Sequence, residues 1–300
     1  MSTETILGID VGGTHTRIGL VNSSFELLDS TIVNTQSWAT QKDNCNALIK
    51  VIQDYLKKAK LDICMISIGL PSTMNHTRSI VLSTPNIVSM DNIPLVSRFE
   101  DALGIRTVVE RDSSMLLMYD LYSNQIPLNG TAIGIYFGTG IGNAIIVDGK
   151  LLIGRNGVAG EIGHIPCLIS EKICSCGNRG CMETYISGRV LEEMCRKEFP
   201  QTHIQDLFLQ HGNEEEVQSY IKRMAIPIAT EINIFDPDRI IIGGGIVAMR
   251  GFPYKILEEN IYEHVRKPMP AQNIEIIYSK PSQFNGIIGA AIYAENKLKD

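Results

Sequence analysis

Short apolar runs bounded by turn residues alternate along the chain with stretches in which apolar residues recur every three or four positions. The short runs predict strands, at residues 5–22 as a hairpin and at residues 27–33, 63–70, 105–110, 132–137, 144–147, 239–242 and 274–278. The helical spacing predicts helices at residues 44–58, 113–122, 191–197, 214–235, 254–265 and 286–298. This alternation of strands and helices predicts an α/β fold with largely parallel sheets.

A buried strand, a glycine-rich turn and a returning strand follow one another twice in the sequence. The turns contain Gly12, Gly13 and Thr14 in the first copy and Gly138, Thr139, Gly140 and Gly142 in the second. Many glycine turns only close a hairpin, but rows of backbone N–H groups in such turns also bind phosphate oxygens. Neither turn fits a Walker A or a Rossmann motif. Because the pattern recurs after a second buried strand, we expect both turns to bind phosphate groups.

The length of 300 residues predicts two domains, since single cores stop growing near about 250 to 300 residues. A polar stretch with a proline at residues 121–129 is the expected boundary. The first domain is therefore expected at residues 1–120 and the second at residues 121–285. Residues 72–94 are polar, contain two prolines and show no period, so we expect a long loop there.

Charge and cysteine content exclude several classes of protein. A net charge of −6 argues against a nucleic-acid-binding surface. The sequence has no apolar run long enough to span a membrane, and its first residues lack the basic and apolar regions of a signal peptide. Seven cysteines are an odd number, which disfavours a secreted disulfide framework. We therefore expect a cytoplasmic protein with reduced thiols.

Three cysteines lie close together in a tract rich in glycine and asparagine. Cys174, Cys176 and Cys181 have the spacing C-x-C-x4-C, and His164 precedes them. Three sulfurs and one nitrogen complete a tetrahedral zinc site, and such a closed site has a structural role. Unligated thiols or a redox pair are the alternatives, and Cys167 competes with His164 for the fourth position. Two carboxylates flank this tract, Glu161 and Glu183.

Two aspartates and a run of glycines follow predicted strands. Asp10 either initiates a turn or lies near the Mg²⁺ of a nucleotide. Asp112 ends a strand, which suits both a helix N-cap and a base that accepts a hydroxyl proton during phosphoryl transfer. Gly243, Gly244 and Gly245 follow another strand, where either close packing or a nearby nucleotide requires glycine.

These motifs together resemble the ROK family (repressor, open reading frame, kinase) of the actin-like ATPase superfamily, over essentially the whole chain. The resemblance rests on DVGGTHTRIGLV, STPN, FGTGIGNAIIVDGKL, GVAGEIGHIPC, CSCGNRGCMETYISG and NIFDPDRIIIGGGI. It implies two actin-like (ribonuclease H-like) domains around a central cleft, with a zinc-bound loop at residues 164–181. The last helix, about residues 286–300, is expected to return to the first domain.

The resemblance also implies roles for individual residues. Asp112 is similar to the catalytic base of the family. The implied sugar contacts are Asn86, Arg111, Asp112, Glu161, His164 and Glu183. The implied ATP contacts are Asp10, Gly12, Gly13, Thr14, Gly138, Thr139, Gly140, Gly142, Gly244 and Gly245. The implied zinc ligands are His164, Cys174, Cys176 and Cys181.

The implied activity is ATP- and Mg²⁺-dependent phosphorylation of a hexose at its 6-hydroxyl. Most relatives have asparagine where this chain has Arg111, and that departure, with GGTH, FDPD and FNG, is similar to members that act on D-allose. We expect Arg111 to change which hydroxyl epimer is accepted. Glucose, fructose and N-acetylmannosamine are the alternative substrates.

The same family pattern is also compatible with a sugar-sensing transcriptional regulator or with a sugar-binding protein whose catalytic site has decayed. The first strand begins by Thr5, which leaves no room before it for a helix-turn-helix. Asp10, Asp112 and both glycine turns are intact, which disfavours a decayed site. We therefore expect a hexose as partner, no nucleic acid or membrane, and a possible homodimer.

Overall fold

The computed structural model describes residues 5–59, 61–85, 87, 90–167 and 171–299. Its chain divides into two compact units. Unit 1 comprises the chain up to Pro127, Ile153–Ala159 and the chain from Ser282 onwards, whereas unit 2 comprises Leu128–Leu152 and Gly160–Pro281. No helix in the described ranges has the length and apolar character that a membrane span requires.

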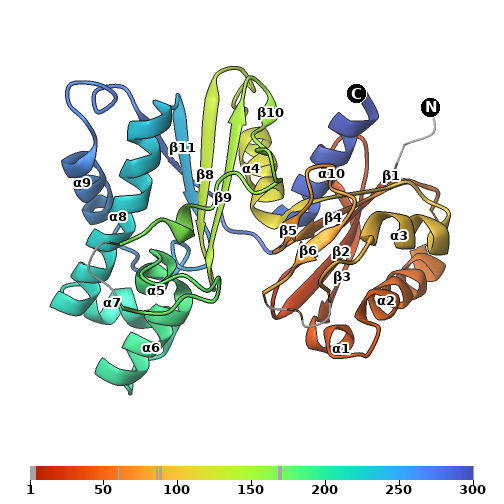
Figure 1. Ribbon diagram of the computed structural model, residues 1–300, viewed down its shortest axis with the longest axis horizontal. Coiled ribbons are helices and arrows are strands. Elements are labelled where there is room, and N and C mark those ends of the chain that lie inside the picture. The colour runs from red at the N-terminus through yellow and green to blue at the C-terminus, as the bar shows by residue number, and fades with distance from the viewer. Residues whose placement is uncertain (1–4, 60, 86, 88–89, 168–170, 300) are drawn as a thin grey trace. The chain divides into compact units, whose positions relative to one another are not determined.

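Unit 1 is built on a five-stranded sheet in the order β3-β2-β1-β4-β7 (Figure 1). Its strands are β1 (Thr5–Val11), β2 (His15–Val21), β3 (Leu27–Asn34), β4 (Ile63–Leu70) and β7 (Thr107–Arg111). The first three form an antiparallel meander, and β4 and β7 continue the sheet in parallel with β1. The helices are α1 (Gln36–Ala39), α2 (Asn44–Ala59), α3 (Leu95–Leu103), α4 (Asp112–Ser123) and α10 (Asn285–Lys299).

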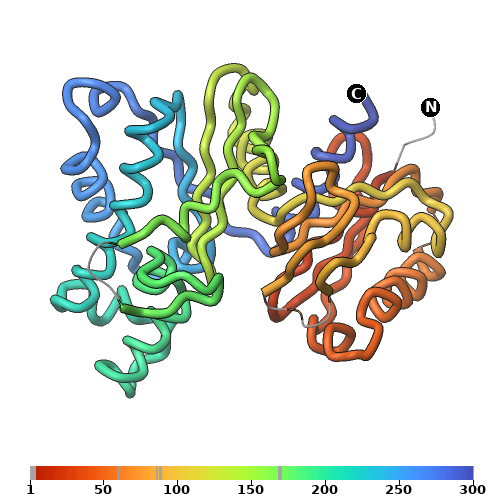
Figure 2. The backbone as a smooth tube through the Cα atoms, viewed as in Figure 1, coloured from red at the N-terminus to blue at the C-terminus, as the bar shows by residue number. Residues whose placement is uncertain are grey.

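Alternating side chains of β1 bury both faces of this sheet. Leu7 and Ile9 pack in a core with Leu48 and Ile52 of α2 and Phe99 of α3. On the opposite face Ile6 packs with Ile287 and Ala291 of α10. Both faces are buried because successive side chains of a strand point to opposite faces of the sheet. Figure 2 shows the resulting chain path, in which the blue C-terminal helix runs beside the red N-terminal strands.

Unit 2 repeats the same strand arrangement, in the order β10-β9-β8-β11-β12. The strands are β8 (Thr131–Phe137), β9 (Ile141–Val147), β10 (Lys150–Leu151), β11 (Arg239–Gly243) and β12 (Glu275–Tyr278). The helical elements are η1 (Ile162–His164), α5 (Glu183–Ile186), α6 (Gly188–Glu198), η2 (Ile204–Asp206), α7 (Leu207–His211), α8 (Glu215–Phe235) and α9 (Tyr254–His264). The recurrence of strand, glycine turn and strand in the sequence therefore corresponds to two sheets of the same topology.

Three expectations from the sequence differ from this fold. Neither sheet is largely parallel, because each combines an antiparallel meander with two parallel strands. The stretch expected as a loop contains a short hairpin of β5 (Thr73–Met74) and β6 (Val81–Ser83), whose two strands are too short to produce a periodic signal. Residues 121–127, 153–159 and 282–285, expected in the second domain, belong to unit 1.

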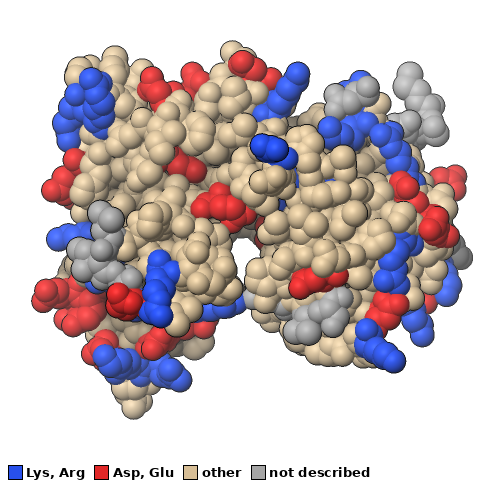
Figure 3. All heavy atoms as spheres, in the orientation of Figure 1, with Lys and Arg blue, Asp and Glu red and all other residues tan. Residues whose placement is uncertain are grey.

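Charges of both signs are interspersed on the face of the molecule shown in Figure 3. This agrees with the modest net charge of −6. On this face no extended field of one sign would attract a polyanion.

Candidate functional site

One edge of the sheet in unit 1 brings two carboxylates together. Because β1, β4 and β7 are parallel, their carboxyl ends meet at the same edge. The register pairs Asp10 with Gly69 and Gly69 with Glu110, and Asp112 follows two residues later. A Cβ added to Gly69 would lie 3.5 Å from the Cα atom of Asp112. Asp10 and Asp112, predicted separately from the sequence, thus occupy neighbouring positions.

Asp10 lies within β1, so it does not initiate a turn. Burial, and then the negative charge of Asp112, raise the pKa of Asp10 to about 6, against the opposing effect of Arg17. Arg17 Nη1 lies 3.3 Å from Asp10 Oδ2. Gly286, at the start of α10, leaves room for this carboxyl group, since a Cβ there would lie 2.5 Å from Asp10 Cγ. A cation bound at this edge would relieve the repulsion between the two aspartates.

Asp112 is the first residue of α4 and not its N-cap, which is Arg111. Its Oδ1 accepts a hydrogen bond of 2.7 Å from the backbone N–H of Ser113. A carboxylate in the first turn of a helix is stabilised by the helix dipole. The hydrogen bond from Ser113 therefore orients this carboxylate.

The first glycine turn joins β1 and β2 and presents free amide groups. Gly12 donates its N–H to His15 O (2.9 Å), and Thr35 Oγ1 donates to Gly12 O (2.7 Å). Within the described part of the chain, the amides of Gly13 and Thr14 donate no hydrogen bond, and both residues are exposed. Such a pair of N–H groups is suited to bind an anion.

The second glycine turn is held by the start of two helices. Gly138 accepts a hydrogen bond of 2.8 Å from the N–H of Gly188 at the start of α6. Glu183, the first residue of α5, accepts the N–H of Ile141 at 2.9 Å through Oε2. Strand β9 already begins at Ile141, so Gly142 lies in the strand, and Thr139 is exposed at the tip. Glu183 therefore organises this turn.

Gly244 requires glycine for a steric reason. Its φ is +97°, and a Cβ would collide with the backbone carbonyl of Phe137, the last residue of β8. Gly245 has open space around its Cα atom. The 243–245 turn and the second glycine turn thus lie at the same end of the sheet in unit 2, where β8 and β11 both end.

His164, Cys174, Cys176 and Cys181 converge, with one ligand atom from each lying within 4.8 Å of all the others. The sulfurs of Cys176 and Cys181 are 3.6 Å apart, as are Cys174 Sγ and His164 Nδ1. Two sulfurs bound tetrahedrally to zinc at about 2.3 Å lie about 3.8 Å apart. The spacing and the donor set therefore both fit a zinc ion.

His164 joins this cluster to a carboxylate. While Nδ1 faces the sulfur of Cys174, Nε2 lies 3.7 Å from Oε2 of Glu161. Metal-binding histidines commonly direct their second nitrogen at a carboxylate, which sets the ring orientation. Glu161 remains partly exposed, with 42% of its side chain accessible. It can therefore contact a ligand while the cluster orients the histidine.

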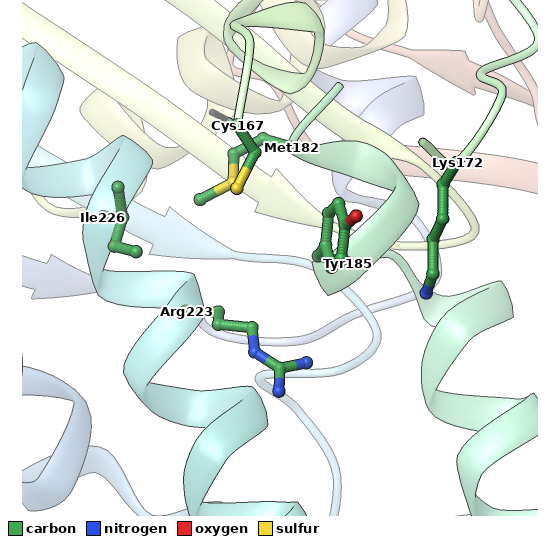
Figure 4. A pocket seen from close by; sticks show the side chains of 6 residues that line it. All are labelled: Cys167, Lys172, Met182, Tyr185, Arg223 and Ile226. Atoms are coloured by element: carbon green, nitrogen blue, oxygen red, sulfur yellow. The ribbon is translucent and has the colours of Figure 1, made fainter. Parts of the chain in front are cut away.

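Cys167, the competing ligand predicted from the sequence, is not part of this cluster. It lines a separate cavity of about 320 Å³ with Met182, Tyr185, Arg223 and Ile226, as Figure 4 shows. Lys172 lies above the Tyr185 ring in the same cavity, with Nζ 4.6 Å from the ring centre. The geometry therefore favours His164 as the fourth ligand.

Arg111 and Asn86 are the two remaining predicted sugar contacts. Arg111 is only 7% exposed, and its Nη2 donates a hydrogen bond of 2.7 Å to the carbonyl of Ala159. It faces backbone in unit 1. Asn86 lies outside the described residues.

The sequence reasoning missed a buried acid in unit 2. Glu231 of α8 is 2% exposed and accepts a hydrogen bond of 2.9 Å from Nδ2 of Asn143. Burial raises its pKa to about 8, which the hydrogen bond from Asn143 opposes. Glu231 stands three residues after Ile228, on the apolar face of the helix. A charged residue at a core-facing helical position was the signal available in the sequence.

We predict that Glu231→Gln reduces the loss of stability that occurs as the pH rises from 4.5 to about 8. The acid has a pKa near 4.5 when unfolded and about 8 when folded. Between these values the folded state holds the extra proton, so the free energy of unfolding falls as pH rises. At about 1.4 kcal/mol per pKa unit, the loss amounts to a few kcal/mol. Urea unfolding at pH 5 and pH 8 should show a smaller difference for the variant than for the wild type; equal differences would contradict the prediction.

Comparison with known proteins places this chain in a family. Residues 6–297 match the model of the ROK family. The N-acetyl-D-glucosamine kinase of Vibrio cholerae is 28% identical, over 95% of this chain and 97% of its own length. A ROK family glucokinase from Streptomyces griseus, solved with glucose and AMPPNP, superposes with a TM-score of 0.80 at 24% identity, covering 97% of this chain and 99% of its own.

A ROK family transcriptional regulator, a homologue of the E. coli MLC protein, superposes with a TM-score of 0.83 at 25% identity. The match covers 98% of this chain and 78% of the regulator. The chain belongs to the ROK family. The fold is thus shared by sugar kinases and by a regulator. Whether a protein with this fold is a kinase has to be argued from the residues of its site.

Proposed function

We propose that this protein is an ATP-dependent hexose kinase. The observation that carries the proposal is the sheet edge in unit 1, where Asp10 and Asp112 lie beside a glycine turn with free amide groups. A base for the hydroxyl, an acid near the metal and N–H donors for phosphate are the parts that phosphoryl transfer requires. Kinase relatives over nearly the full length support the same function.

Asp112 would accept the proton of the attacking sugar hydroxyl, because the hydrogen bond from Ser113 orients its carboxylate. Gly13 and Thr14, and the second turn around Thr139, would donate N–H groups to phosphate oxygens. Asp10 would lie near the Mg²⁺ that accompanies ATP and neutralises phosphate charge. Gly244 and Gly245 would lie on the adenosine side.

Glu161, His164 and Glu183 would bind sugar hydroxyls from unit 2. Zinc held by His164 and the three cysteines would have a structural role, because four protein ligands leave no open coordination position. The ion would orient His164 so that Nε2 remains available beside Glu161. In this proposal the metal shapes the sugar site without taking part in the transfer.

The substrate that we propose is D-allose, phosphorylated at the 6-hydroxyl. The support is the Arg111-Asp112 pair, part of the sequence pattern that resembles family members acting on D-allose. Because Arg111 donates to Ala159 O, we expect it to influence the sugar through the backbone it holds. Glucose, N-acetylglucosamine and N-acetylmannosamine are the competing substrates.

A panel of these four hexoses, each with ATP and Mg²⁺, tests the proposal by ADP release. We expect sugar-dependent ADP release, the highest kcat/KM for D-allose, and a 6-phosphate product by NMR. A clear preference for another hexose would remove the allose assignment and leave the kinase. If sugars bind but none releases ADP, a sugar-sensing regulator becomes the better description.

A further inference from the structure

Residues 153–159 form an irregular segment that we call the strap. It contains no helix or strand, and Gly154 and Gly157 adopt left-handed backbone conformations with φ of +74° and +83°. Its own backbone makes few hydrogen bonds, among them Ala159 N to Ile153 O at 3.1 Å. A segment of this kind is held in place mainly by contacts with other parts of the chain.

Three side chains of unit 1 hold the carbonyl groups of the strap. Arg78 donates from Nη1 to Gly157 O at 2.6 Å, and Arg111 donates from Nη2 to Ala159 O at 2.7 Å. His76 Nδ1 lies 3.0 Å from Gly154 O. A Cβ on Gly157 would collide with the carbonyl of Met74, so the strap also packs directly on the β5–β6 hairpin.

Arg78 itself is fixed by a buried ion pair. Its Nε donates to Oε2 of Glu110 at 2.8 Å, and the two side chains are 7% and 1% exposed. The second oxygen of Glu110 accepts the N–H of Arg111 at 2.8 Å. Buried ion pairs contribute little net stability and are often replaceable by apolar residues. Here the pair instead orients a guanidinium fork that reaches two acceptors at once.

The strap ends immediately before the proposed sugar-binding residues. Gly160 follows Ala159, and Glu161 comes next, with His164 three residues further. Two residues can span at most about 7 Å, so the position of Ala159 limits where Glu161 can lie. Gly160 packs closely on the side chain of Asn143, since a Cβ there would collide with Oδ1 of Asn143.

We infer that Arg78, oriented by Glu110, is a positioning residue for sugar binding, which acts through the strap on Glu161. Arg111 fixes the strap in the same way, since it donates a hydrogen bond to the last carbonyl group of the strap. The inference rests on the proposed function insofar as Glu161 contacts the sugar. It assigns a role to Arg78 and Glu110, which the sequence motifs left unexplained.

Arg78→Lys tests this inference kinetically, with Arg98→Lys as the matched control. Lysine keeps the charge beside Glu110 but lacks the fork needed to reach Gly157 O as well. Arg98 forms an ion pair of the same length, 2.8 Å, with Asp43 elsewhere in unit 1. We expect the KM for the sugar to rise roughly tenfold or more in Arg78→Lys, because small misplacements of binding groups have large effects. The KM for ATP and the kcat should stay near wild type, as should all constants of Arg98→Lys.

A merely structural role would lower the active fraction and leave the sugar KM unchanged. That result, or an equal rise in both KM values, would overturn the inference.

Hydrogen exchange provides a readout that does not depend on kinase activity. We expect faster exchange in peptides covering residues 153–164 of Arg78→Lys, and wild-type exchange there in Arg98→Lys. If no hexose is phosphorylated by the wild type, the proposed function fails. The exchange measurement still tests whether Arg78 fixes the backbone of the strap. Unchanged exchange in Arg78→Lys would overturn the inference even if the wild type is an active kinase.

Discussion

Asp112→Asn is expected to lose roughly 10²- to 10⁴-fold in kcat, the usual contribution of a positioned general base. Asparagine has nearly the same shape and can still accept the N–H of Ser113. It cannot take the proton of the attacking hydroxyl. Sugar binding should therefore remain close to that of the wild type, because the amide preserves the volume and one acceptor of the side chain.

Turnover measured by ADP release and sugar affinity measured by calorimetry separate these effects. Asp101→Asn is a suitable control, since Asp101 is exposed on α3, away from the sheet edge. The control should behave as the wild type in both measurements. If Asp112→Asn turned over at the wild-type rate, Asp112 would not be the base.

Cys181→Ser is expected to have the second large effect, on metal content and on sugar affinity together. Cys181 is buried in the cluster, with its sulfur 3.6 Å from that of Cys176. Structural zinc contributes free energy of folding directly, on the order of 10 kcal/mol in small zinc modules. The loss of stability should be smaller here, because Met182, the next residue in the chain, belongs to a large apolar core in unit 2. We expect a lower melting temperature and at least tenfold weaker sugar binding as His164 loses its orientation.

The matched control is Cys167→Ser, because Cys167 lies beside the cluster but lines a separate cavity. Zinc measured by elemental analysis should be one ion per wild-type chain and per Cys167→Ser chain, and should be lost in Cys181→Ser. Equal zinc loss in both variants would show that Cys167 is a ligand. Wild-type zinc content in Cys181→Ser would exclude the proposed site.

Most secondary structure could be predicted because the apolar pattern is strong in buried strands. The strand predicted at residues 63–70 agrees with β4 at both ends, and helix α8 begins one residue after its predicted start. Strand direction could be predicted only in part. The hairpin predicted at residues 5–22 is confirmed by the antiparallel pairing of β1 and β2. Hydrophobic runs show burial, but they do not reveal that β3 adds a further antiparallel strand while β4 runs parallel to β1.

The candidate site could be predicted where residues adjacent in sequence determine its geometry. The two glycine turns and the C-x-C-x4-C tract are local features, and left-handed glycines at Gly177 and Gly180 allow the cysteine loop to close. Roles that depend on distant partners could not be predicted. Arg111 was predicted to select the sugar epimer, which stays a prediction, but its hydrogen bond to Ala159 O, 48 positions away in the chain, could not be predicted.

The sequence by itself determined the α/β class, the duplicated strand and glycine-turn pattern, the candidate metal-binding residues and the resemblance to the ROK family. These depend on periodicity and on short spacings, which a linear pattern contains. Only the tertiary structure decided which buried polar groups meet, Arg78 with Glu110 and Glu231 with Asn143, and that the strap belongs to unit 1. Such pairs form because a buried polar group must find a partner in three dimensions, and chain folding, not sequence proximity, supplies it.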